Sequence, residues 1–387
     1  MHHNRRVRYA GVLVDTARVY FSISDLKGIV DFIAKLGFNL LHLRLTDDQS
    51  FMLKFDSYPE LAVPSVPGGS VYSVEEMKHL VQFATERRVF IMPELNIPGH
   101  AGGWSGIPGL IVNCPKYFCE EAWGIPLNHQ NAGLMSILES LLGELKEIFH
   151  TSPFIHLGGD EMKLSRPCFL EAGRNVLDTD KFERDLQSII SNTSLTSPKI
   201  VRWEDSITIA LLEKQQETVT HYWYRSPRDF KGGKPRMPYF VSSHLYIDTM
   251  TDQDDAWHMF QDVRGFAEDT LYPPLGIIAG AFELNKKSWL DRNVYGKLVA
   301  MSMALSKNTG MATIDKISVL QSKYLAACIS AKPAHLDKET WRNVCNALGK
   351  PILGINKWRS TWEKETKEWK RRICIRLNGT LPSKTRK

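Results

Sequence analysis

Short apolar runs alternate with longer amphipathic stretches along most of this sequence. Eight of the runs have the composition of buried strands, at residues 10–14, 39–45, 89–94, 154–157, 199–203, 218–223, 239–242 and 276–279. Strands buried on both faces read as continuous apolar segments and are typical of parallel sheets. Their alternation with helical patterns therefore predicts an α/β fold.

A helical pattern or a long loop follows each of these runs. Within residues 24–36 apolar residues recur every three or four positions, with Ser24 as the expected N-cap and Gly37 just after the helix. Comparable patterns cover residues 74–87, 134–149, 181–191, 206–214, 255–263 and 295–305. Eight βα units over roughly 300 residues predict a (β/α)8 TIM barrel.

The chain divides into a barrel and a C-terminal extension. We expect residues 1–310 to form the barrel, and residues 311–387 to form helices that pack on it and a basic tail. One helical stripe of large apolar residues lies in that extension: Ile355, Trp358, Trp362, Trp369 and Ile373. Packing in a core or an interface is the leading interpretation of this stripe, and a helix lying on a membrane surface is the alternative.

Polar and aromatic residues recur at the carboxyl ends of the predicted strands. They are Asp15 with Arg18, Asp47 with Asp48, Glu94 with His100, Asp160 with Glu161, Trp203 with Glu204, and Trp223. In a parallel barrel these ends share one face, where active sites are built. The set as a whole therefore predicts an active site on that face.

The segment F-I-H-L-G-G-D-E-M at 154–162 is the most informative of these strand ends. Its two glycines can release the backbone from the strand and turn both Asp160 and Glu161 into one opening. Two neighbouring carboxylates titrate as a pair, so that one can act as a general acid while the other stays charged. A solvated surface turn is the alternative, and His156 within the strand is interpreted as structural.

Composition excludes several classes of function. The net charge of +6 is modest for 387 residues and the basic residues concentrate in 370–387, which does not indicate nucleic-acid binding. No stretch of 18 apolar residues predicts a membrane span, and residues 1–6 lack the apolar core of a signal peptide.

The six cysteines have no metal-ligand spacing, so no metal site is expected. Free buried thiols are one interpretation of them. Their even number, together with sequons at Asn192 and Asn378, favours an oxidising compartment.

Several motifs together resemble a known family. They are D-T-A-R, L-H-L-R-L-T-D-D-Q-S-F, P-E-L-N-I-P-G-H, H-L-G-G-D-E, W-E-D and Y-I-D. Over Gly11 to Cys345 the sequence resembles the glycoside hydrolase family 20 β-N-acetylhexosaminidases, in particular the lysosomal α/β-subunit type. The resemblance implies an exo-acting retaining enzyme in which the 2-acetamido group of the substrate is the nucleophile.

The same resemblance implies a catalytic set. Glu161 would be the general acid and later the base, and Asp160 would hold the acetamide N–H and stabilise the oxazolinium-like charge. Tyr246 would donate its hydroxyl to the acetamide oxygen. Asp47 and His100 would orient Glu161.

It also implies a sugar-binding set. Arg18 would donate to the 3- and 4-hydroxyls of the terminal sugar, and Asp248 would accept from the 4-hydroxyl. Trp203 and Trp223 would wall the acetamide pocket, while Trp257 would stack on the sugar at the reducing side.

Each of these residues, taken singly, has a purely structural alternative. Arg18 could simply pair with Asp15 at a strand end, and His100 could be a satisfied buried histidine. Trp203 and Trp223 could belong to the core.

One stretch departs from the family. At the last strand the family has G-G-x-x-x-x-W-x-E, whereas here Asn285 stands at the tryptophan position and Lys287 at the glutamate position. The change predicts reduced activity on neutral N-acetylglucosaminides, or a preference for a sugar bearing an acidic group. Alternatively, Trp289 or Glu283 supplies the function through a local shift.

The resemblance pairs Cys114 with Cys168 and Cys328 with Cys345 as disulfides, and leaves Cys119 and Cys374 unassigned. The N-terminal α/β domain that usually precedes the barrel in this family is not expected here, because Arg18 comes so early.

We therefore expect a β-N-acetylhexosaminidase without metal or organic cofactor. Its substrate would be a glycan or glycoconjugate with a terminal N-acetylhexosamine, its location lysosomal or secreted, and its assembly a possible homodimer. The alternatives are a carbohydrate-binding relative with lost turnover and a relative specific for a charged or larger sugar.

Overall fold

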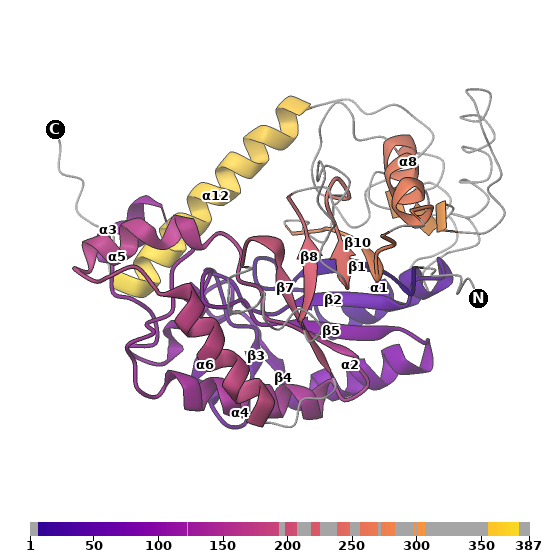
Figure 1. The fold of residues 1–387 in the computed structure, drawn as a ribbon. Helices are drawn as coiled ribbons and strands as arrows, with labels where there is room; N and C mark the ends of the chain where they lie inside the picture. The colour runs from indigo at the N-terminus through magenta and orange to yellow at the C-terminus, as the bar shows by residue number, and fades with distance from the viewer. Residues whose placement is uncertain are drawn as a thin grey trace.

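The apolar runs form a closed barrel of parallel strands with helices around it in the computed structural model of the protein (Figure 1). The structure describes residues 7–121, 123–192, 198–206, 218–224, 238–247, 256–269, 272–282, 297–298, 301–302, 304–305 and 355–378. In chain order the barrel strands are β1 (Tyr9–Asp15), β2 (Leu40–Arg44), β5 (Phe90–Glu94), β6 (Phe154–His156), β7 (Lys199–Trp203), β8 (Thr218–Tyr222), β9 (Tyr239–Val241) and β10 (Gly276–Ala279).

Strand β1 pairs in parallel with β2 on one side and with β10 on the other, which closes the ring. All eight predicted strands are confirmed, each to within one residue at either end. The predicted (β/α)8 barrel is therefore confirmed, and the carboxyl ends of its strands form one rim.

The described helices include α1 (Ile23–Lys35), α2 (Val74–Glu86), α4 (Leu134–Ile148), α6 (Thr179–Asn192) and α8 (Ala256–Ala267), close to their predicted ranges. Residues 207–214 and most of 295–305 lie outside the described residues. The predicted N-cap of α1 is wrong, because Ser22 caps this helix. Its Oγ accepts from the N–H of Asp25 and Asp25 accepts from the N–H of Ser22, a reciprocal pair that Ser24 could not form with Lys27.

Two apolar layers cover the two faces of the strands. The inner layer fills the barrel with side chains from alternate positions of the strands: Leu13, Leu40, Met92, Phe154, Val201, Trp203, Val219, Phe240 and Ile278. The outer layer packs the opposite faces of the strands against the helices. At the amino ends of the strands the Tyr9, Phe154 and Phe240 rings pack together, with the ring centroid of Phe154 5.0 Å from each of the other two. The barrel is therefore a packed core and not a pore.

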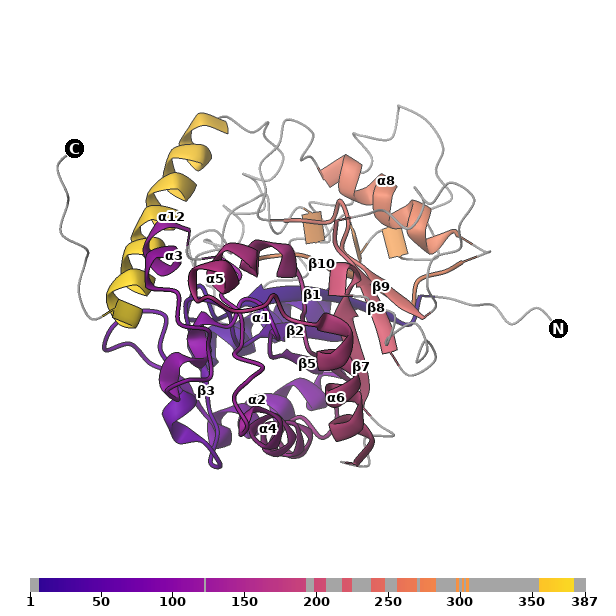
Figure 2. The ribbon, with the colours of Figure 1, turned by 60° about the vertical axis from the view of Figure 1, so that its left-hand side comes forward.

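Loops at the carboxyl rim carry short elements. These are β3 (Leu53–Lys54), η1 (Pro59–Leu61), β4 (Tyr72–Ser73), η2 (Gly102–Gly106), α3 (Pro115–Glu120), η3 (Met162–Ser165), α5 (Arg166–Glu171) and η4 (Glu204–Ser206). Among them, α3 and α5 lie side by side next to η3, which follows β6 (Figure 2).

The C-terminal helix α12 (Ile355–Asn378) packs against α3 (Figures 1 and 2). In its described second half, Trp369 and Ile373 are buried, as the predicted stripe requires. The side chains of residues 355–366, and all of residues 311–354, lie outside what the structure describes, so the proposed boundary at residue 310 stays a prediction. No described helix is both long and apolar enough to cross a membrane.

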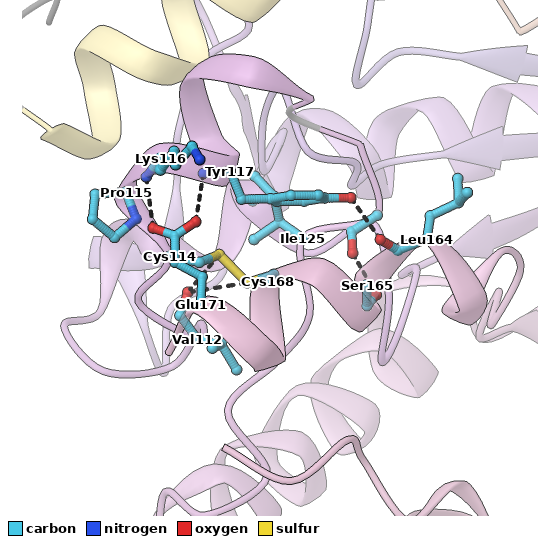
Figure 3. The surroundings of a disulfide bond; sticks show 12 residues. Val112, Cys114, Pro115, Lys116, Tyr117, Ile125, Leu164, Ser165, Cys168 and Glu171 are labelled. Atoms are coloured by element: carbon cyan, nitrogen blue, oxygen red, sulfur yellow. Dashed lines mark hydrogen bonds between the residues drawn. A yellow bond between two sulfur atoms is a disulfide. The ribbon is translucent and has the colours of Figure 1, made fainter. Parts of the chain in front are cut away.

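Two disulfides join parts of the chain that are distant in sequence. The predicted Cys114–Cys168 bond is confirmed and ties the start of α3 to α5 (Figure 3). A second bond joins Cys119 to Cys374, the two residues left unassigned, and so links α3 to α12. The predicted partners Cys328 and Cys345 lie outside the described residues.

Candidate active site

Asp160 and Glu161 follow β6 at the carboxyl rim, as predicted. Their side chains are 14% and 38% exposed, respectively, so both carboxylates remain accessible from solvent. Positive φ angles at Gly158 (56°), Gly159 (96°) and Glu161 itself (56°) turn the chain here. The predicted glycine turn is thus present, and the left-handed conformation of Glu161 is an additional feature.

The amide of Asn96 holds this turn from the end of β5. Its Oδ1 accepts from the N–H of Gly159 at 2.8 Å, and its Nδ2 donates to Oδ1 of Asp160 at 2.7 Å. Asn96 therefore orients Asp160, a contribution that the sequence analysis missed although the residue lies within P-E-L-N-I-P-G-H.

His100 connects the two carboxylates to a buried acidic pair. Its Nε2 lies 3.3 Å from Oε2 of Glu161 and 3.7 Å from Oδ2 of Asp160. Its Nδ1 lies 3.2 Å from Oδ1 of Asp47 and 3.1 Å from Oδ2 of Asp48. Burial opposes the charged imidazolium, but the carboxylates of Asp47 and Asp160 raise the pKa of His100 well above its usual value. His100 is thus held as a cation whose N–H groups can point at Glu161 and at the acidic pair.

Two arginines surround Asp47. Arg18 lies 3.0 Å and Arg44 lies 2.6 Å from its Oδ2, and Arg18 also lies 2.8 Å from Oδ2 of Asp15. Burial works against ionisation of Asp47, yet Arg18, Arg44 and His100 hold its pKa well below the usual range. Burial has the larger effect at Asp15 and raises the pKa of that carboxyl to about 6.

The pairing of Arg18 with Asp15, the structural alternative considered from the sequence, is present. Arg18 also lies 3.0 Å from Asp47, and its side chain is 8% exposed. Its role toward a sugar stays a prediction.

Glu94 and Trp203 form the floor of the site inside the barrel. Oε1 of Glu94 accepts from Nη1 of Arg44 and from Nε1 of Trp203, both at 3.0 Å, and Oε2 lies 2.7 Å from Nε2 of His42. Burial raises the pKa of Glu94 to about 7, against the opposing effect of Arg44. Trp203 is 1% exposed and stacks on His221 with a centroid distance of 4.2 Å. Its role as a wall for an acetamide stays a prediction.

Three buried histidines continue this floor. His156 accepts from the N–H of Gly158 through Nδ1 at 2.9 Å, which leaves its Nε2–H to donate to Nδ1 of His221 at 3.2 Å. The Nε2–H of His221 then donates to Oγ of Ser242 at 2.7 Å. Ligand atoms of His42, His156 and His221 lie within 4.8 Å of one another, as in a metal site, but this hydrogen-bond chain occupies the facing nitrogens of His156 and His221. Asp47, Asp48 and His100 form a second such group, already linked by hydrogen bonds.

Asp205, after β7, is a second residue that the sequence analysis left without a role. Its Oδ2 accepts from the N–H of Glu161 at 2.7 Å, and its Oδ1 accepts from Nε1 of Trp223 at 3.1 Å. Burial, reinforced by the charge of Asp160, raises the pKa of Asp205. The W-E-D motif contained this residue, but no local pattern indicated its partner.

The remaining predicted residues are only partly described. Trp223 is half-buried beside Asp205, and the ring of Tyr246 stacks on Phe282 with a centroid distance of 5.3 Å. Phe282 in turn lies 5.7 Å from the guanidinium carbon of Arg44. The structure does not describe the other predicted positions: Asp248, the side chain of Trp257, Glu283, Asn285, Lys287 and Trp289.

Comparison with known proteins decides the family. The profile described as glycosyl hydrolase family 20, catalytic domain, matches residues 8–270, which is more than half of the chain. The chain belongs to glycoside hydrolase family 20. The matched region runs from β1 into the stretch that follows α8 and contains every catalytic residue predicted from the sequence.

Family 20 relatives agree with this assignment. Beta-hexosaminidase subunit A1 of Dictyostelium discoideum is 26% identical over 270 residues, which are 66% of this chain and 49% of that relative. Beta-hexosaminidase 3 of Arabidopsis thaliana is 28% identical over 227 residues, 56% of this chain and 41% of that relative. The chitooligosaccharidolytic beta-N-acetylglucosaminidase of Bombyx mori is 35% identical over 191 residues, 47% of this chain and 31% of that relative. The chain thus spans less than half the length of each, and the lysosomal subunit type stays a prediction.

Solved family 20 structures share the fold. The Flavobacterium johnsoniae chitobiase superposes with a TM-score of 0.64 and 17% identity, over 91% of this chain and 56% of that chain. The β-N-acetylhexosaminidase of Bacteroides fragilis superposes with a TM-score of 0.63 and 18% identity, over 87% of this chain and 75% of that chain.

Proposed function

We propose that this protein is a retaining exo-β-N-acetylhexosaminidase that releases terminal N-acetylglucosamine or N-acetylgalactosamine from glycans. The observation that carries the proposal is the arrangement of Glu161 and Asp160 around Nε2 of His100, at 3.3 Å and 3.7 Å, on the open rim of the barrel. Family membership and the names of the relatives support the same reaction.

In the first step the acetamido oxygen of the substrate attacks the anomeric carbon while the bond to the leaving oxygen breaks. Glu161 gives its proton to that oxygen and becomes a carboxylate, which the N–H of the His100 imidazolium stabilises at 3.3 Å. Asp160, held by Asn96, accepts the acetamido N–H and balances the positive charge of the oxazolinium ring.

In the second step water attacks the anomeric carbon and gives its proton to the Glu161 carboxylate, which opens the oxazolinium ring and restores the acid. Two displacements at the same carbon retain its configuration. Tyr246 would donate to the acetamide oxygen, and Trp203, Trp223 and Trp257 would contact the sugar and its acetyl group. Arg18 and Asp248 would bind the ring hydroxyls.

The test is release of the aryl group from an aryl N-acetyl-β-glucosaminide. Glu161→Gln should lower kcat/KM by about 100-fold or more, because the amide cannot donate the proton. Glu139→Gln, an exposed change on α4, should behave like the parent. Equal rates for the parent and Glu161→Gln would overturn the proposed mechanism.

A carbohydrate-binding protein without turnover is the second candidate, and the substitutions at Asn285 and Lys287 favour it. A parent as inert as Glu161→Gln, with both proteins still binding a thiazoline inhibitor, would establish this second function. Turnover restricted to sugars with an acidic group would instead identify a relative with altered specificity. Lys287→Glu should then restore activity on the neutral glycoside.

We also propose that the protein works in an oxidising compartment, lysosomal or secreted, because two described disulfides tie its loops together. A homodimer is the proposed assembly. Immunolocalisation of the full-length protein tests the compartment, and sedimentation velocity over a range of protein concentrations tests the dimer.

A further inference from the structure

Arg376 of helix α12 inserts its guanidinium between two loops of the active site. Its Nη1 donates to the carbonyl oxygen of Gln49, and its Nη2 donates to the carbonyl oxygens of Asp48 at 2.6 Å and Gly102 at 3.0 Å. The first two acceptors belong to the loop after β2 and the third to the loop after β5. One side chain, more than 270 residues away in sequence, thus joins both loops.

The two loops carry Asp48 and His100. The Asp48 carboxylate accepts from the N–H groups of Gly102 at 3.2 Å, Gly124 at 2.7 Å and Ile125 at 3.0 Å. Its Oδ2 also lies 3.1 Å from Nδ1 of His100. Arg376 therefore holds the main chain of Asp48 at the point where the Asp48 side chain orients the imidazole next to Glu161.

Contacts with α3 hold the part of helix α12 that carries Arg376. The Cys119–Cys374 disulfide joins it to α3 two residues before Arg376. Asn378, two residues after Arg376, donates from Nδ2 to the carbonyl oxygen of Pro115 at 2.9 Å. Lys370 adds a contact from Nζ to the carbonyl oxygen of Glu120 at 3.2 Å. Arg376 is thus fixed on both sides by contacts with one short helix.

That short helix also contacts the segment that follows Glu161. The hydroxyl of Tyr117 donates to the carbonyl oxygen of Leu164 at 2.7 Å, and Glu171 accepts from the N–H groups of Lys116 and Tyr117 (Figure 3). The Cys114–Cys168 bond closes the same unit. Helix α3 therefore connects α12 to the segment that follows Glu161, while Arg376 of α12 itself contacts the loops of Asp48 and His100.

Arg376 remains charged in this position at neutral pH. Burial lowers the pKa of its guanidinium to about 10, and the carboxylate of Asp48 partly opposes that effect. A cation donating to three carbonyl oxygens forms stronger bonds than a neutral donor would.

We propose that Arg376 is a positioning residue, which through the carbonyls of Asp48, Gln49 and Gly102 sets the Asp48–His100 contact and thereby orients Glu161. As far as turnover is concerned, this inference rests on the proposed hexosaminidase function. The described hydrogen bonds of Arg376 go to main-chain carbonyl oxygens and include none of the described residues expected to touch the sugar. Its effect should therefore be on kcat and not on KM.

The test is Arg376→Met in the full chain, with Arg371→Met as the matched control. Arg371 lies on the same helix but is exposed, and it pairs with Glu368 of its own helix. Arg376→Met should lower kcat about 10- to 100-fold with KM changed less than about twofold. It should also move the alkaline limb of the pH–rate profile to lower pH, because a less well oriented imidazolium loses its proton more readily. Arg376→Lys should recover part of the rate.

Hydrogen exchange of peptides covering residues 45–52 and 98–104 supplies a readout that does not need turnover. Both peptides should exchange faster in Arg376→Met and in Cys374→Ser than in the parent, and Arg371→Met should match the parent. If the parent is inactive on every glycoside, the proposed function fails while this exchange result still supports the inference. The inference is overturned if both peptides exchange in Arg376→Met at the rate of the parent. It is also overturned if Arg376→Met has a lowered Tm but keeps the kcat and the pH–rate profile of the parent.

Discussion

The backbone N–H of Glu161 donates to Oδ2 of Asp205 at 2.7 Å, which links the end of β6 to the end of β7. Glu161 has a φ of 56°, a left-handed conformation that residues other than glycine rarely adopt without external contacts. Asp205 also accepts from the indole N–H of Trp223 at 3.1 Å. A single carboxylate therefore holds the candidate acid and a candidate pocket residue in one arrangement.

Replacing Asp205 tests this link. Asp205→Ala should lower kcat about 10- to 100-fold, since it removes the acceptor for the N–H of Glu161 and leaves the left-handed turn unsupported. Asp205→Asn, which keeps one acceptor oxygen, should cost less. Steady-state kinetics on the aryl glycoside measure both, and equal rates for alanine and parent would contradict the role.

Because of His100, the stability of the protein should fall as pH rises above neutral. Asp47 and Asp160 raise the pKa of His100 well above the usual 6.5, although burial opposes them. The folded state therefore binds the proton of His100 more tightly than the unfolded state does. That contribution is fully present below about pH 6.5 and is lost as pH rises through the folded-state pKa. The free energy of unfolding, measured with urea, should therefore differ between the parent and His100→Gln by an amount that shrinks as pH rises above about 6.5. A constant difference would show that His100 is not held as a cation.

Glu94 should also make the stability of the protein depend on pH, in a lower pH range than His100 does. Burial raises its pKa from 4.5 to about 7, so its contribution is present below about pH 4.5 and is lost as pH rises through about 7. Glu94→Gln cannot titrate. The stability of this variant relative to the parent should therefore increase by about 3 kcal/mol between about pH 4 and about pH 8. Denaturant melts at the two pH values measure the change, and a decrease would contradict the raised pKa.

Alanine substitutions at Gly158 and at Gly143 should change the stability of the protein in opposite directions. Gly158 has a φ of 56°, and a Cβ there would lie 2.9 Å from Cα of Asn96, so Gly158→Ala should destabilise the protein by about 2 kcal/mol or more. Gly143 lies within α4 and an added Cβ meets nothing within 4 Å. Gly143→Ala should stabilise by about 0.5–1 kcal/mol. Thermal unfolding distinguishes the two variants, and a tolerated Gly158→Ala would show that the turn can relax.

Patterns over a few neighbouring residues were enough to predict the barrel. The strands are largely buried on both faces, which favours mostly apolar runs, and the polar residues at the rim lie at the end of such a run or within a few residues after it. The N-cap of α1 was missed by two residues because Ser24 also suits a cap, and only the reciprocal contact between Ser22 and Asp25 decides between them.

No local pattern in the sequence indicated the contacts between residues that are distant along the chain. Asn96 binds Asp160 across 64 positions, Asp205 binds Glu161 across 44, and Cys119 bonds to Cys374 across 255. Arg44 lay within a quoted motif without any indication that it would bind Asp47 and Glu94 together. The family resemblance supplied the catalytic residues but not these supporting ones.

The sequence by itself determined which strands form, at which end of each strand the reactive side chains lie, and to which family they are similar. These properties depend on neighbours in the chain, whose spacing alone sets the exposed face of a strand or helix. The tertiary structure alone decided how His100 is charged, how Glu161 is held, and that α12 reaches the loops of Asp48 and His100. Those properties depend on burial and on charges within a few ångströms, and closing the barrel is what brings such groups together.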